Sequence, residues 1–139
     1  MNPAPVLTVE GLAKTFVLHT QGGVRLPVFD GAAFAVAPGD CVVLAGPSGS
    51  GKSTLLRSLY ANYLPDGGHI WVRHAGGWVD MVNAEPREVL AVRRETMGYV
   101  SQFLRVIPRV PTLDIVAEPL LAQGFEQAEA ETRAKAVLS

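Results

Sequence analysis

Residues Gly46–Ser53 are the part of this sequence with the clearest chemistry. They read G-P-S-G-S-G-K-S and fit the pattern G-x-x-x-x-G-K-[ST] at each fixed position. Glycine lets a backbone adopt conformations that a Cβ forbids and approach an anion closely. Successive N–H groups of such a loop converge on phosphate oxygens. The pattern therefore predicts a loop that binds the phosphates of a nucleotide.

The polar side chains of this segment suit that chemistry. The Lys52 ammonium can reach the outer phosphates as a point charge, and the Ser53 hydroxyl is a hard oxygen ligand for Mg²⁺. Thr54 can serve the inner phosphate through its N–H and hydroxyl. The other expected phosphate contacts come from the loop, at Gly46, Ser48, Gly49, Ser50 and Gly51. The expected cofactors are ATP and Mg²⁺.

Such a loop needs a strand before it and a helix after it. Cys41–Ala45 is an apolar run between turn residues, which predicts a strand buried on both faces, as in a parallel sheet. Lys52–Asn62 has apolar residues at helical spacing, which predicts a helix whose first N–H groups and dipole favour an anion. A chance match to the pattern is the alternative, and this strand-loop-helix context argues against it.

The rest of the chain alternates strand and helix patterns. Further strands are predicted at residues 6–9, 15–18, 28–36 and 97–103, and a hairpin at 70–82 with its turn at 74–77. Further helices are predicted at residues 86–94, 113–121 and 126–138, the second of them capped by Thr112. This mixture indicates an α/β fold.

Composition limits the partners and the location. The formal net charge of −1 gives no field that would recruit nucleic acid or an anionic membrane. The one cysteine, Cys41, cannot form a disulfide within the chain, which fits a reducing compartment. No apolar stretch reaches the roughly 20 residues that span a bilayer. We therefore expect a cytoplasmic protein that contacts neither nucleic acid nor the membrane interior directly.

Four stretches together resemble the first half of an ABC-type ATP-binding subunit. They are Val9–Phe16, Pro38–Asp40, Gly46–Leu56 and Tyr99–Gln102. The resemblance implies a P-loop NTPase with an antiparallel β subdomain and a mainly parallel core sheet, truncated before the end of the domain. It places the β subdomain and the P-loop at residues 1–105 and the start of a helical subdomain at residues 106–139.

The same resemblance assigns two residues outside the P-loop. Phe16 matches the aromatic residue that stacks on adenine, with a core phenylalanine in a strand as the alternative. Gln102 matches the glutamine that contacts Mg²⁺ and the attacking water, with a surface glutamine at a strand end as the alternative. The implied catalytic residues are Lys52 and Gln102, and the implied metal contacts are Ser53 and Gln102.

A narrower resemblance is to the PhnL-type ATP-binding subunit of the bacterial carbon–phosphorus lyase system. It rests on Gly23–Val28, Ser53–Asp66 and Val100–Val110. It implies an ATPase that supports attachment of alkylphosphonate to a nucleoside triphosphate. The implied partners are a second ABC subunit, in a homodimer or heterodimer, and the carbon–phosphorus lyase core complex.

Two other functions stay open. The first is the ATPase of an ABC exporter of the lipoprotein or macrolide type, whose N-terminal regions also carry insertions like Gly22–Pro27. The second is a non-hydrolytic, nucleotide-responsive interaction module. It is open because the sequence lacks the family's signature loop, its Asp-Glu strand end and its switch histidine. Hydrolysis depends on positioning and charge stabilisation around the γ-phosphate, so we expect this chain alone to bind ATP with little turnover.

Overall fold

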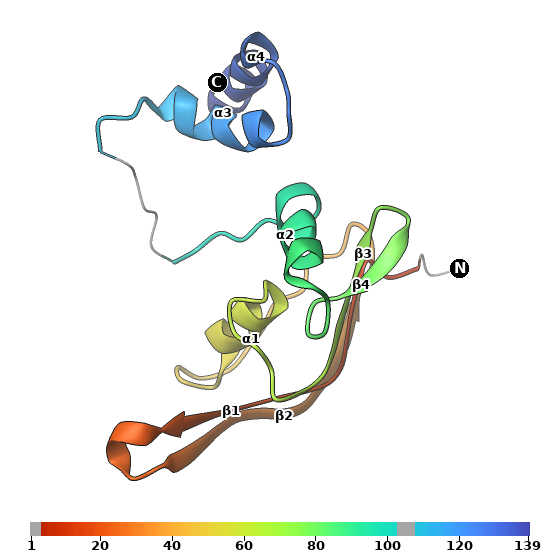
Figure 1. The fold of residues 1–139 in the computed structure, drawn as a ribbon, viewed down its shortest axis with the longest axis vertical. Coiled ribbons are helices and arrows are strands. Elements are labelled where there is room, and N and C mark those ends of the chain that lie inside the picture. The colour runs from red at the N-terminus through yellow and green to blue at the C-terminus, as the bar shows by residue number, and fades with distance from the viewer. Residues whose placement is uncertain (1–3, 103–107) are drawn as a thin grey trace. The chain divides into compact units, whose positions relative to one another are not determined.

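The computed structural model describes residues 4–102 and 108–139, which form two compact units, Met1–Val92 and Arg93–Ser139. The strands are β1 (Leu7–Leu18), β2 (Val24–Val36), β3 (Gly67–His74) and β4 (Gly77–Asp80) (Figure 1). The helices are the 3-10 helix η1 (His19–Gln21), α1 (Lys52–Leu59), α2 (Pro86–Glu95), α3 (Thr112–Ala122) and α4 (Gln127–Leu138). None of the described helices is long and apolar enough to cross a membrane.

The four strands form one antiparallel sheet in the order β2-β1-β3-β4. Strand β1 lies inside the sheet, paired with β2 along its length and with β3 through its first half. It is one continuous strand where the sequence predicted two. Register shifts between Val9 and Thr15 absorb the interruption at Gly11, because a bulge accommodates an extra residue without ending the strand.

The core of the first unit lies on one face of this sheet. Val9 of β1 pairs with Ile70 of β3 and with Phe34 of β2, so their side chains share that face because strand residues alternate between faces. The buried core residues, each no more than 3% exposed, are Val9, Leu12, Ile70, Val72, Met81 and Val92. Helix α1 lies beside the sheet (Figure 1). Gly51, which directly precedes the helix, approaches Val28 of β2 closely.

The predicted hairpin is confirmed by β3 and β4. Its two turn residues, Ala75 and Gly76, have φ of 48° and 81°, and His74 pairs with Gly77. Two central residues with positive φ are the mark of a type I′ turn, whose twist matches that of the flanking strands.

Two predicted strands do not form among the described residues. Cys41–Ala45 lies outside every strand; Cys41 is exposed and Val43 is 79% exposed. The strand predicted at residues 97–103 is also absent over residues 97–102, and Phe103 lies outside the described residues. A parallel strand takes its hydrogen bonds from neighbours distant in sequence, and the described residues place no such neighbour beside either segment.

In the second unit α3 and α4 pack on a small apolar core. Its buried residues are Ala117, Ala130 and Ala134, surrounded by Leu113, Val116, Leu120 and Phe125. The prediction that Thr112 caps the first of these helices is wrong. Pro111 holds the N-cap position with φ of −57° and ψ of 142°, and no side chain caps the helix. The cap position needs an extended backbone, which proline adopts readily before a helix.

Candidate functional site

The loop at residues 46–51 has a backbone that only glycine supports at its two ends. Gly46 has φ of 153° and Gly51 has φ of 92°. A Cβ on Gly51 would lie 2.5 Å from Cγ1 of Val28 in β2, and one on Gly46 would lie 2.8 Å from Oγ of Ser50. The glycines of the motif therefore bring the loop against the sheet and let it close on itself.

Helix α1 begins directly after this loop with no side-chain cap. Gly51 occupies the N-cap position without a side-chain hydrogen bond, and the first turn holds no acidic residue. The first N–H groups of a helix have no partner within it, and the helix dipole adds positive potential at that end. The start of α1 thus has the electrostatics of an anion site.

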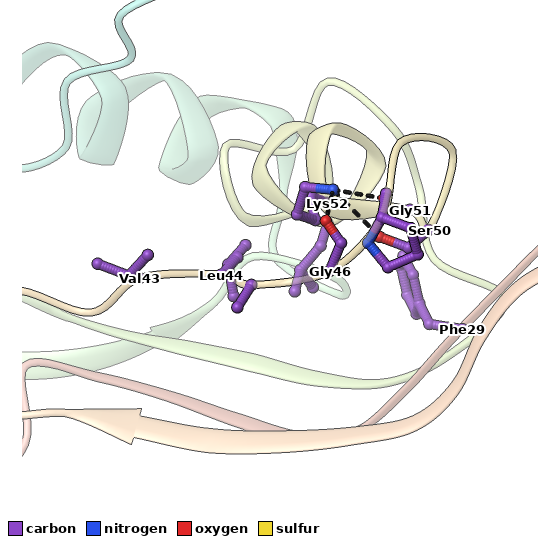
Figure 2. A pocket seen from close by; sticks show the side chains of 10 residues that line it. Phe29, Val43, Leu44, Gly46, Ser50, Gly51 and Lys52 are labelled. Atoms are coloured by element: carbon purple, nitrogen blue, oxygen red, sulfur yellow. Dashed lines mark hydrogen bonds between the residues drawn. The ribbon is translucent and has the colours of Figure 1, made fainter.

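The Lys52 side chain is folded back over the loop. Its Nζ donates to the carbonyl oxygens of Gly46 at 2.7 Å and Pro47 at 2.6 Å, and to Oγ of Ser50 at 3.2 Å (Figure 2). These acceptors are exposed, so water or phosphate oxygens can replace them. The ammonium is already at the loop where the predicted role needs it.

A cavity of about 370 Å³ lies between this loop and strand β2. Figure 2 shows Val43 at one end of it, Ser50 and Phe29 at the other, and Leu44 and Lys52 between them. The remaining lining residues are Ala45, Gly46, Pro47, Gly51 and Leu55. The loop at residues 46–51 is therefore bordered by apolar surface, part of which comes from the segment at residues 41–45.

Ser53 and Thr54 occupy the first turn of α1. Ser53 is exposed, and its hydroxyl has no hydrogen-bond partner among the side chains that the structure describes. Thr54 is half-buried, and its carbonyl oxygen accepts a 2.9 Å hydrogen bond from the buried hydroxyl of Ser58. The magnesium contact of Ser53 stays a prediction. In the described parts of the chain no group of three His, Cys, Asp or Glu side chains could hold a metal ion.

Phe16 lies in β1 and is half-buried. Its ring centroid is 5.5 Å from that of Tyr63 in an edge-on arrangement, and the Lys14 ammonium lies 5.2 Å from the same centroid. The stacking role stays a prediction.

Gln102 lies in the second unit, exposed and at a bend of the chain. Its predicted contact with Mg²⁺ and water therefore also stays a prediction. The structure adds four residues that sequence reasoning did not single out. Lys14 and Tyr63 contact Phe16. Arg57 is hydrogen-bonded to Tyr63, and Asp66 is hydrogen-bonded to Lys14 and to the Thr15 N–H. The segment Ser53–Asp66, noted above only for its resemblance, contains three of them.

Comparison with known proteins gives the family. The sequence profile described as "ABC transporter" matches residues 29–139. The chain is 39% identical over 124 residues to the lipoprotein-releasing system ATP-binding protein LolD of Coxiella burnetii, covering 89% of this chain and 50% of that protein. It is 40% identical over 135 residues to LolD of Ruegeria pomeroyi, covering 97% of this chain and 57% of that protein. The chain spans about half the length of the curated relatives it matches.

A solved structure gives the fold. The ATP-binding cassette MJ0796, a dimer in a post-hydrolysis state with ADP and Pi, matches with a TM-score of 0.77 at 24% identity, covering 92% of this chain and 53% of that one. This likeness confirms the predicted ABC cassette fold, although the described residues form only its antiparallel sheet and helices. On the match of its residues 29–139, the chain belongs to the ABC transporter family.

Proposed function

We propose that this chain binds the triphosphate of MgATP at residues 46–54, as the nucleotide-binding part of an ABC ATPase. The observation that carries the proposal is one local geometry. A loop with glycines at positive φ leads into the uncapped start of α1, with the Lys52 ammonium folded onto it. Backbone N–H groups, a helix dipole and a cation then converge on one polyanion.

The proposed residue roles rest on the family resemblance, and the geometry of the loop supports the role of Lys52. Lys52 binds the outer phosphates, Ser53 supplies an oxygen to Mg²⁺, and Thr54 serves the inner phosphate. Phe16 stacks on the adenine ring, and Gln102 contacts Mg²⁺ and the attacking water. Ser53 and Gln102 would hold Mg²⁺, which would neutralise part of the phosphate charge. We propose that the 139 residues bind ATP with little turnover, because no Asp-Glu pair of the family's kind occurs in them.

The relatives favour the exporter function over the carbon–phosphorus lyase function. The relatives reported above are named lipoprotein-releasing ATP-binding proteins, so we propose an ABC exporter ATPase of that type as the first candidate. The lyase subunit remains a second candidate, on the resemblance of Ser53–Asp66 and Val100–Val110. In either case the partner is a second ABC subunit, as in the dimeric cassette with the same fold.

Nucleotide binding is tested with a fluorescent ATP analogue and the variant Lys52→Ala. We expect binding by the wild-type chain and loss of it in the variant. Lys135→Ala is the matched control, because it removes the same charge from an exposed lysine in α4. Equal binding by Lys52→Ala and wild type would refute the proposal.

The two candidate systems are separated by co-purification. A membrane permease retained by the tagged chain in its native host supports the exporter function. Retention of soluble lyase subunits supports the lyase function.

A further inference from the structure

Helix α1 ends in a turn that sends the chain back along the helix. The Ala61 N–H donates to the Ser58 carbonyl at 2.9 Å, and the Asn62 N–H donates to the Arg57 carbonyl at 2.8 Å. Ala61 has φ of 58°. These are the two hydrogen bonds and the left-handed residue of a Schellman motif. The motif fixes the direction of the following residue, Tyr63, relative to α1.

Tyr63 is joined to α1 through Arg57. The guanidinium NH1 donates to the tyrosine hydroxyl at 2.8 Å, and the guanidinium carbon lies 5.6 Å from the centroid of the tyrosine ring. Both side chains are half-buried. A planar guanidinium loses little further freedom for each hydrogen bond it makes, so this contact holds the ring to the helix that starts at the phosphate loop.

The ring of Tyr63 also contacts Phe16. The two ring centroids are 5.5 Å apart and the ring planes meet at 82°. This edge-to-face geometry is a favoured one for aromatic pairs. In this arrangement Tyr63 covers at most one face of the Phe16 ring.

Hydrogen bonds also join residues 13–15 of β1 to residues 64–66. The Asp66 N–H donates to the Ala13 carbonyl at 2.8 Å, and the Thr15 N–H donates to the Asp66 carboxylate at 2.5 Å. The Lys14 ammonium donates to the Leu64 carbonyl at 2.7 Å. Residues 13–16 of β1 are thus bound to residues 63–66 at several points, with the pair of rings at one end.

We propose that Tyr63 is a positioning residue for nucleotide binding. It holds the Phe16 ring at a fixed place relative to α1, so that one nucleotide can bind its phosphates at the start of α1 and its base on Phe16. The inference rests on the proposed function, because it concerns the base end of the same nucleotide. It predicts that Tyr63 contributes to the binding of the base and not to the binding of the phosphates.

The test compares MgATP with magnesium tripolyphosphate, which has the phosphates without the base. We expect Tyr63→Ala to weaken MgATP binding about 2- to 12-fold, the range that corresponds to one aromatic pair. Tripolyphosphate binding should change less than twofold. Inactive protein lowers the number of binding sites and leaves both Kd values unchanged, so the comparison tolerates partial unfolding of the variant.

Further variants separate positioning from general packing. Tyr63→Phe keeps the ring pair and loses the bond to Arg57, so its effect should lie between wild type and Tyr63→Ala. In Phe16→Ala, the additional change Tyr63→Ala should have no further effect on MgATP binding. Tyr60→Ala, at the end of the same helix, is the matched control and should leave the ratio of the two Kd values unchanged.

Three outcomes would overturn the inference. Tyr63→Ala could leave MgATP binding unchanged, or weaken MgATP and tripolyphosphate equally, while the wild type binds both; either result makes Tyr63 a structural residue only. If the wild-type chain binds neither ligand, the proposed function itself fails and the inference fails with it.

Discussion

Strand β3 and the segment at residues 41–45 both carry apolar β-branched side chains, but these side chains have opposite environments. In β3, Ile70 is fully buried and Val72 is 3% exposed, whereas Val42 and Val43 of the other segment are 50% and 79% exposed. Strand β3 has β1 on one side and β4 on the other. Among the described residues no strand lies beside residues 41–45. Apolar composition makes a segment able to form a buried strand, and neighbouring strands decide whether it does.

The largest expected effect is on the stability of the sheet. Ile70→Ala removes a buried side chain and leaves a cavity, which should lower the free energy of unfolding by about 2–5 kcal/mol. Val43→Ala should change it by no more than about 0.5 kcal/mol, as at other exposed sites. Urea unfolding of both variants measures the difference.

The alkylation rate of Cys41 gives a second measure of how exposed residues 41–45 are. It is the one cysteine of the chain and it is exposed, so an alkylating reagent should modify it in the folded protein as fast as in urea. Strong protection of Cys41 from alkylation would show that this segment is buried in solution. So would a loss of unfolding free energy in Val43→Ala as large as that in Ile70→Ala.

The parts of the fold that could be predicted from the sequence are those that depend on neighbours in the chain. The hairpin of β3 and β4 follows from two turn residues, and α1 follows from apolar spacing after a glycine loop. The parallel strands could not be predicted correctly, because their burial depends on strands that the described residues do not supply. At the site, the glycine pattern predicted a loop that leads into a helix, and the structure has both; phosphate binding by this loop stays a prediction.

The surroundings of Phe16 could not be predicted in the same way. The contact with Tyr63 joins residues 16 and 63, and no local pattern marks such a distant pair. It depends on the left-handed turn at Ala61, where the sequence shows alanine and not the expected glycine. Spacing within the chain therefore identified the loop at residues 46–51 and missed the residues that contact Phe16.

The next effect concerns the point where the sheet and the phosphate loop touch. Gly51→Ala places a Cβ 2.5 Å from Cγ1 of Val28, at a φ of 92°, whereas Gly49→Ala has the same kind of strain at φ of 79° with nothing within 4 Å. A left-handed backbone alone costs alanine about 1–2 kcal/mol. We therefore expect Gly51→Ala to weaken MgATP binding about tenfold more than Gly49→Ala.

Titration with MgATP measures that difference, and thermal unfolding of both variants shows whether the fold survives. Because Val28 belongs to β2, Val28→Ala should partly restore binding to Gly51→Ala. Equal affinities for the two glycine variants would mean that the loop does not rest on the sheet.

A smaller effect is expected at Asp66, which ties β1 to the residues after α1. The hydrogen bond from the Thr15 N–H, together with the charge of Lys14, lowers the pKa of Asp66 below its ordinary value of 3.8. The unfolded chain has the ordinary pKa, so folding favours the carboxylate. This stabilisation is fully present above the ordinary pKa and is lost as the pH falls through the lowered pKa of the folded state.

Urea midpoints of wild type and Asp66→Asn between pH 5 and pH 2 measure this contribution. Asparagine can still accept from Thr15 but carries no charge, so the gap between the two midpoints should narrow as the pH falls. Parallel curves would show that the Asp66 carboxylate does not stabilise the fold.

The smallest effect is expected at Ala61, where the position of Tyr63 depends on one left-handed residue. Ala61→Gly relieves the strain at φ of 58° but gives the unfolded chain more freedom, and these effects nearly cancel. The net gain in the free energy of unfolding should be about 0.5 kcal/mol or less.

Ala61→Val, with a β-branched side chain that resists positive φ, should instead lose stability and weaken MgATP binding more than tripolyphosphate binding. Thermal unfolding should therefore rank the stability of Ala61→Gly at or above that of wild type, and that of wild type above Ala61→Val. The two titrations should give the same order for MgATP affinity relative to tripolyphosphate affinity. Wild-type behaviour of the valine variant would show that this turn does not set the position of Tyr63.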